Sequence, residues 1–196
     1  MLMIDEVFVN DVTLLLIGSV ITLIGAILLY FLQQMILRYV QRRGEISLYY
    51  KHVHNKVNGL PASIREGGTL LTIPLWLELH NNKEVNQVVR NINVALYNSE
   101  RMVDKAIQTN YMTKGEEKMY LGNNGSYSFN LPSESIQQFE VYYLFKKSDV
   151  NKKFDSVYIT YYTSKDEMIQ SKILDLKDGW NTKKLNLKND WIKSKS

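Results

Sequence analysis

Three histidines are the residues of this chain with the clearest potential for metal chemistry. His52 and His54 form a His-x-His pair, and on a strand both side chains would point to one face and could share a zinc ion. A zinc site normally needs three or four converging ligands, and the sequence contains one further histidine, His80. We therefore favour the other interpretation, that His52 and His54 are exposed imidazoles in a stalk preceding the domain.

Acidic residues near the C-terminal loops are the second candidate for chemistry. On a C2-like layout these loops could line a calcium site through Asp155, Asp166, Glu167, Asp175 and Asp178. Calcium loops carry Asp or Asn at close alternating spacing together with Gly, and that spacing is missing here. The sequence therefore does not favour a calcium site.

Catalytic motifs are missing from the sequence. It has no Gly-x-x-x-x-Gly-Lys-Ser/Thr phosphate loop, no Gly-x-Ser-x-Gly elbow and no Gly-x-Gly-x-x-Gly. It also has no cysteine, which excludes disulfides, thiol nucleophiles and cysteine zinc sites. We expect a protein that is not an enzyme and that holds no cofactor.

The most informative element is an uncharged stretch, residues 12–37, between Asp11 and Arg38. Its first part is apolar on all sides and long enough to cross a hydrocarbon core of about 30 Å as a helix. A signal peptide would have a basic start and a shorter apolar run, and a core helix would rarely be apolar on every face. We predict a transmembrane helix, with these residues in the span: Val12, Leu16, Gly18, Thr22, Gly25, Ala26, Leu29 and Leu32.

Charges on the two sides of this helix predict its orientation. Three acidic residues and no basic residue precede it, whereas Arg38, Arg42 and Arg43 follow it. Basic residues next to a span stay in the cytoplasm, so we expect the N-terminus outside and the C-terminal domain in the cytoplasm.

Small residues recur on one face of the predicted span. Gly18, Thr22 and Ala26 are four positions apart, a spacing that lets two helices approach closely. This pattern suggests a homodimer or a partner helix. Gly and Ala are common in any span, however, and we favour that simpler explanation.

After Gly44 the apolar residues alternate, as they do in half-buried strands. The clearest strand has five alternating apolar residues: Leu71, Ile73, Leu75, Leu77 and Leu79. Pro74 lies on its other face and has no N–H, which predicts an edge or a bulge there. Seven or eight short strands separated by polar turns indicate an antiparallel β-sandwich.

The predicted fold is thus one N-terminal transmembrane α-helix followed by an all-β antiparallel sandwich with an immunoglobulin-like or C2-like layout. Immunoglobulin-like refers to layout alone, because the Cys…Trp…Cys core of antibody domains is missing. The expected parts are an acidic tail (1–11), the span (12–37), a basic stalk running into the first strand (38–59), the sandwich (60–180) and a Lys-rich tail (181–196).

Charge suggests which partners to expect. Residues 38–196 carry 24 basic and 17 acidic side chains, an excess that would attract the domain to anionic lipid. The bases are mostly lysines dispersed among acids, so we expect no nucleic acid partner.

The C-terminal tail has two interpretations. Trp191 with Lys193 and Lys195 fits either docking on lipid or a closing strand.

Tyrosines leave two interpretations open. Many of them fall in predicted strands. They fit core packing, which we favour, or a recognition face.

Taken together, the span, the sandwich and the missing catalytic motifs predict a membrane-anchored binding or adaptor protein in contact with the bilayer and a protein partner. The alternatives are a surface-exposed recognition or adhesion domain and a peripheral module that binds anionic lipid.

Overall fold

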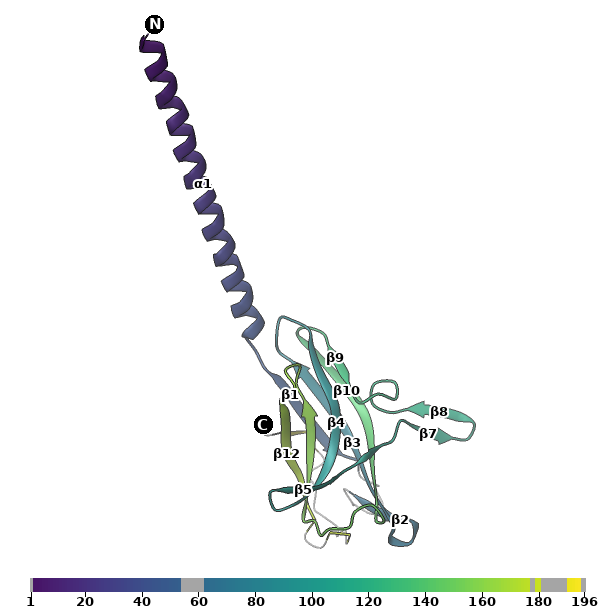
Figure 1. Ribbon diagram of the computed structural model, residues 1–196. Helices are drawn as coiled ribbons and strands as arrows, with labels where there is room; N and C mark the ends of the chain where they lie inside the picture. The colour runs from purple at the N-terminus through teal and green to yellow at the C-terminus, as the bar shows by residue number, and fades with distance from the viewer. Residues whose placement is uncertain (1, 54–61, 177–178, 181–189, 195–196) are drawn as a thin grey trace. The chain divides into compact units, whose positions relative to one another are not determined.

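An apolar helix and an all-β domain follow one another along the chain (Figure 1). The computed structural model describes residues 2–53, 62–176, 179–180 and 190–194, with the side chains of residues 2–9 and 42 left aside. The chain divides into two compact units, Met1–Arg43 and Gly44–Ser196. Each unit is described by itself below.

Helix α1 (Leu2–Arg42) runs without a break for 41 residues, about 60 Å at 1.5 Å per residue. It includes most of the predicted acidic tail and the beginning of the predicted stalk, because no proline or turn signal interrupts the sequence there. It ends just before Gly44, where the apolar pattern changes to that of strands, because a glycine after the last turn favours the end of a helix. The Arg43 N–H donates to the carbonyls of Tyr39 and Val40, both at 3.1 Å, and Gly44 follows with φ +86°.

Thirteen strands are described after Gly44, more than the seven or eight predicted, because the region between residues 101 and 131 forms several short strands. Their bounds are β1 (Ile46–His52), β2 (Ser63–Arg65), β3 (Leu70–Asn81), β4 (Gln87–Asn98), β5 (Arg101–Lys105), β6 (Ile107–Gln108), β7 (Tyr111–Lys114), β8 (Glu117–Tyr120), β9 (Phe129–Leu131), β10 (Ser135–Lys146), β11 (Ser156–Tyr162), β12 (Met168–Asp175) and β13 (Ile192–Lys193). One 3₁₀ turn, η1 (Glu66–Gly68), joins β2 to β3.

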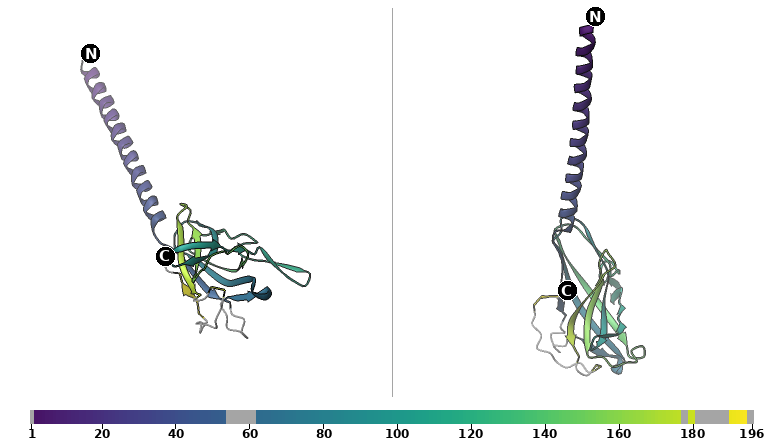
Figure 2. Two further views of the ribbon diagram at one scale, coloured as in Figure 1. Left: turned by 60° about the horizontal axis from the view of Figure 1, so that its bottom comes forward. Right: turned by 60° about the vertical axis from the view of Figure 1, so that its left-hand side comes forward.

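Eleven of these strands form two antiparallel sheets, and β7 and β8 form a separate two-stranded hairpin (Figures 1 and 2). The first has the order β13-β1-β3-β10-β6, with β2 also paired to β3. The second has the order β12-β11-β4-β5, with β9 also paired to β4. The predicted antiparallel all-β sandwich is therefore confirmed.

Strand β3 lies at the centre of the first sheet, not at its edge. It pairs with β10 along its whole length, and Pro74 lies opposite Tyr142. On its other side, pairing with β1 ends at Leu75 and pairing with β2 begins at Thr72. Neither β1 nor β2 pairs with β3 beside Pro74, so this residue needs no N–H donor on that side. The predicted sheet edge is therefore confined to this point of β3.

The core fills the space between the two sheets. The five alternating residues of β3 are each 0% exposed, as their pattern predicts. They pack with apolar residues of the second sheet, including Ile92, Val94, Leu96, Val157 and Ile159. Burying each such side chain contributes roughly 1.5–3 kcal/mol, so this layer stabilises the domain.

The tail closes one edge of the first sheet. Strand β13 pairs with β1, with Ile192 opposite Tyr50 and Lys193 opposite Tyr49. Lys193 also donates to the Glu45 carboxylate at 2.8 Å. Residues 192–193 of the tail therefore form a closing strand, which was one of its two interpretations.

Candidate functional site

His52 holds the two sheets together from inside the sandwich. It lies opposite Leu75 on the core face of β1 and is 5% exposed. Its Nε2 donates to the carbonyl of Ile173 at 3.2 Å. The register of β11 and β12 shifts between Val157 and Tyr158, which leaves Ile173 without a cross-strand partner in β11. His52 thus satisfies a buried carbonyl that a bulge would otherwise orphan.

The expectation that His52 is exposed is therefore wrong. His52 and His80 also lie too far apart to bind one zinc ion. His80 points to the opposite face of β3, five residues from the partner of His52, or about 17 Å along the strand. There it bonds to Glu78 at 2.5 Å and stacks on Tyr49. His54 lies outside the described residues. Within the described part, no three His, Cys, Asp or Glu side chains converge on a metal-sized site.

The C-terminal acids lie in two groups at opposite ends of β11, about 20 Å apart, with Asp166 and Glu167 at one end and Asp155 and Asp175 at the other. Asp166 pairs with Arg90 beside the β11–β12 turn, while Asp175 pairs with Lys172 at the other end. Asp155, at that end, accepts the Ser156 hydroxyl and the Ser99 N–H, and these bonds hold its pKa below the usual range. The carboxylates of Asp155, Asp166 and Asp175 thus have protein partners, and Asp178 lies outside the described residues.

The apolar helix exposes its whole surface. One described helix is long and apolar enough to cross a membrane, Asn10–Gln41, and none of its most apolar stretch is buried within the protein. Leu16 is 61% exposed and Leu29 is also 61% exposed. Such a surface is incompatible with water unless lipid or another helix covers it. Val12 and Leu32 belong to the same exposed surface.

The small residues of the helix leave an open face. A side chain added at Gly18 or Gly25 would meet nothing within 4 Å in the single chain. The Thr22 hydroxyl donates to the Gly18 carbonyl at 2.8 Å, so it is satisfied within its own helix. Ala26 follows one turn later, and the predicted homodimer through this face stays a prediction.

The basic residues after the span lie where the helix ends. Arg38 and Arg43 are exposed, and Arg42 is the last helical residue. This placement keeps the flanking charges together at one end of the helix. It does not by itself fix which side of a membrane they occupy.

The tyrosines divide between the core and the outer faces. Tyr50, Tyr143 and Tyr161 are buried, and burial raises the pKa of each phenol, that of Tyr143 most strongly. The Tyr143 hydroxyl crosses the core and donates to the Ile92 carbonyl at 3.1 Å. Core packing therefore accounts for the most buried tyrosines, as the favoured interpretation requires.

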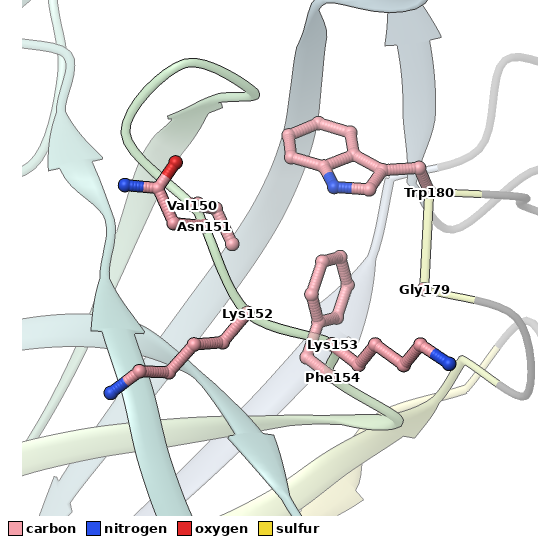
Figure 3. Close-up of a pocket in the computed structure, with 7 residues that line it drawn as sticks. All are labelled: Val150, Asn151, Lys152, Lys153, Phe154, Gly179 and Trp180. Atoms are coloured by element: carbon pink, nitrogen blue, oxygen red, sulfur yellow. The ribbon is translucent and has the colours of Figure 1, made fainter.

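A pocket that the sequence does not reveal lies where the β10–β11 loop meets the turn after β12 (Figure 3). It has a volume of about 500 Å³ and is lined by Val150, Asn151, Lys152, Lys153, Phe154, Gly179 and Trp180. Its two walls are residues 150–154 and 179–180, at least 25 residues apart in the sequence, so no local sequence pattern predicts the pocket. The one available signal is a tryptophan in a Lys-rich region.

The β7–β8 hairpin is a second feature that sequence reasoning missed. It projects from the sandwich and pairs with neither sheet (Figures 1 and 2). Tyr111 and Tyr120 face each other across it, 46% and 55% exposed. Lys118 lies over the Tyr111 ring at 4.9 Å. Tyrosine is enriched at protein interfaces, which makes the hairpin a candidate contact surface.

Comparison with known protein families matches residues 40–174 to the family described as the YopI Ig-like domain. This match covers more than half of the chain. No curated protein and no solved structure matches the chain.

Proposed function

The chain belongs to the YopI Ig-like domain family, and from this premise we propose that it is a single-pass membrane protein whose Ig-like domain acts in the cytoplasm as an adaptor. In this proposal the helix anchors the protein in the bilayer. The domain then binds another protein at the membrane and catalyses no reaction. The observation that carries the proposal is the fully exposed apolar surface of α1.

Anchoring follows from the energetics of that surface. The apolar side chains between Val12 and Leu37 are 39–74% exposed where they are large. In lipid this surface is favourable, and every helical backbone group is paired within the helix itself. Because the helix is not buried in the protein, the role of a soluble core helix is not supported.

The cytoplasmic placement rests on the charge asymmetry. Arg38, Arg42 and Arg43 follow the span directly, and no basic residue precedes it. Moving a short basic segment across a membrane is unfavourable, and this supports retention of the arginines with the domain on the inner side.

The role in binding is supported by how the polar side chains of the domain are used. His52, Asp155 and Tyr143 each hold a backbone group in place, so they act in folding. The features that face outward are the β7–β8 hairpin and the pocket beside Trp180. Contact surfaces of this kind suit recognition of a partner.

Membrane extraction tests the proposal. The full chain with a C-terminal tag is expressed, membranes are washed at alkaline pH, and the protein retained is sized and sequenced from its N-terminus. We expect the protein to stay with the membrane until detergent is added and to retain residues 12–37. Release by the alkaline wash, or a mature chain that begins after the apolar stretch as for a cleaved signal peptide, would contradict it.

A further inference from the structure

The pocket beside Trp180 lies at the end of the sandwich opposite to the point where the chain enters it. Ile46, the first residue of β1, is opposite Asn81, whereas the β10–β11 loop follows Lys146, which is opposite Leu70. Strand β3 separates these ends by 12 residues, or about 40 Å. The pocket is thus surrounded by loops at the end of the domain that the anchor does not enter.

Backbone hydrogen bonds hold the pocket walls in shape. The Leu176 N–H donates to the Asp155 carbonyl at 2.6 Å, and the Gly179 N–H donates to the Leu176 carbonyl at 3.1 Å. On the other wall, the Val150 N–H donates to the Lys146 carbonyl at 3.2 Å. Gly179 has φ +58°, which few other residues adopt, so the turn is built for this geometry. These hydrogen bonds support the described part of both pocket walls.

The centre of the pocket is aromatic. Phe154 is 4% exposed and packs edge-on against the half-buried indole of Trp180, with ring centroids 5.7 Å apart. Val150, also buried, completes the apolar part of the lining. Because Phe154 and Val150 are buried, the half-buried Trp180 ring is the surface that would pack against an apolar side chain of a ligand.

The charged part of the lining is basic. Lys152 and Lys153 line the pocket, and the Lys147 ammonium lies 5.9 Å from the centre of the Trp180 ring. None of the seven described lining residues is acidic. In the part of the chain that the structure describes, none of these lysines forms an ion pair, whereas Lys172 and Lys193 each pair with a carboxylate.

The described acids nearest to these lysines in sequence are hydrogen-bonded to serines and form no ion pair with the lysines. Asp149 accepts the Ser148 hydroxyl at 2.7 Å, and Asp155 accepts the Ser156 hydroxyl at 2.6 Å. These bonds leave the negative charge of both carboxylates in place, but neither carboxylate lines the pocket. The described lining carries Lys152 and Lys153 and no acid, and this charge would attract an anion from outside.

We propose that this pocket binds an acidic peptide segment of a partner protein, with an apolar side chain against Trp180 and carboxylates beside Lys152 and Lys153. Figure 3 shows the two lysine side chains extending in opposite directions from the aromatic centre. That arrangement fits acids on both sides of an apolar residue better than one compact anion. The inference rests on the proposed adaptor function and names the chemistry of its partner.

Peptide binding tests this inference on the full chain in detergent micelles. The probe is a short blocked peptide in which a leucine lies between two pairs of glutamates, and the control peptide carries glutamines instead. Trp180 fluorescence, identified by its loss in Trp180→Phe, reports binding. We expect saturable binding of the acidic peptide in low salt, weakening as salt rises, and at least about tenfold weaker binding of the glutamine peptide.

Matched lysine variants locate the site. Lys152→Gln/Lys153→Gln is expected to weaken peptide binding about twentyfold, because each exposed ion pair contributes about fivefold. The control Lys114→Gln/Lys165→Gln removes the same charge from the hairpin and from the β11–β12 turn, and it should leave binding within about twofold. Unchanged thermal unfolding of both variants excludes a folding defect.

Three results would overturn the proposal. One is equal binding of both peptides, and another is an equal loss in the control variant. The third is binding of phosphatidylserine vesicles that depends on Lys152 and Lys153 while the peptide does not bind, which would identify lipid as the occupant. Membrane extraction of the wild-type chain does not depend on this pocket, so failure of the two proposals can be told apart.

Discussion

Two leucines show how differently the helix and the sandwich use the same side chain. Leu16 on α1 is 61% exposed, whereas Leu75 on β3 is 0% exposed. The helix pairs its backbone groups locally and turns every side chain outward. The sandwich pairs strands that are distant in sequence and covers its apolar residues with its own second sheet. The domain therefore buries its apolar residues within itself, while the large apolar residues of the helix stay exposed.

Leu75→Ala is expected to have the largest effect on the stability of the domain, and it tests the contrast between the buried core and the exposed helix. The substitution opens a cavity between the sheets and should lower the free energy of unfolding of the domain by about 2–5 kcal/mol. The matched change Leu16→Ala removes the same atoms from a surface that the domain does not bury, and it should leave domain unfolding unchanged. Thermal or denaturant unfolding of the full chain in detergent measures both. Equal losses would contradict the separation of the two regions.

Ile21→Arg tests the helix side of the comparison. Ile21 is 64% exposed near the middle of the apolar stretch, and an arginine at the centre of a span costs about 2.5–3.5 kcal/mol on insertion scales. We expect a large decrease in the fraction of protein that resists alkaline extraction, with the domain still folded. Ile21→Ala is the control. An undiminished membrane fraction for the arginine variant would argue against a span.

His52→Ala breaks the link between the two sheets. It leaves the buried carbonyl of Ile173 without its donor, which should cost about 1–3 kcal/mol of unfolding free energy. His80→Ala loses a more accessible contact with Glu78 and should cost at most about 1 kcal/mol. Denaturant unfolding of the two variants compares them. A larger loss for His80→Ala would refute the structural role assigned to His52.

The smallest effect concerns Asp155 and pH. Hydrogen bonds from Ser156 and Ser99 lower the pKa of this carboxyl in the folded protein, so it stabilises the fold above its unfolded pKa, near 3.9. That contribution is lost as pH falls through the lower, folded pKa. Asp155→Asn should therefore be less stable than wild type at pH 6, and the difference should shrink on acidification. Parallel unfolding curves measured from pH 6 to pH 2 test this, and a difference independent of pH would contradict it.

Local patterns were sufficient to predict two features of this molecule, the end of α1 and the core face of β3. The end of α1 just before Gly44 follows from a glycine that adopts positive φ, a conformation that commonly ends a helix. The core face of β3 follows from strict alternation, since a period of two is specific to strands. Both features depend on residues adjacent in sequence, which is why the sequence alone predicts them.

Features that depend on distant residues were not predictable. His52 is buried because its partner Ile173, 121 residues later, lies on a bulge of the opposite sheet. The pocket exists because Phe154 and Trp180 meet across two loops. Pro74 in a central strand is tolerated because β1 gives way to β2 beside it. Each feature requires the pairing of whole strands, which a periodicity does not specify.

Topology is the most direct test of the proposed cytoplasmic adaptor. Two reporters, one active in the cytoplasm and one active outside it, are fused separately after Ser196. The account predicts activity of the cytoplasmic reporter alone, and a shift toward the outside when Arg38, Arg42 and Arg43 are replaced by glutamine. Activity of the outside reporter alone on the wild-type chain would contradict the account and would instead support a surface-exposed recognition domain.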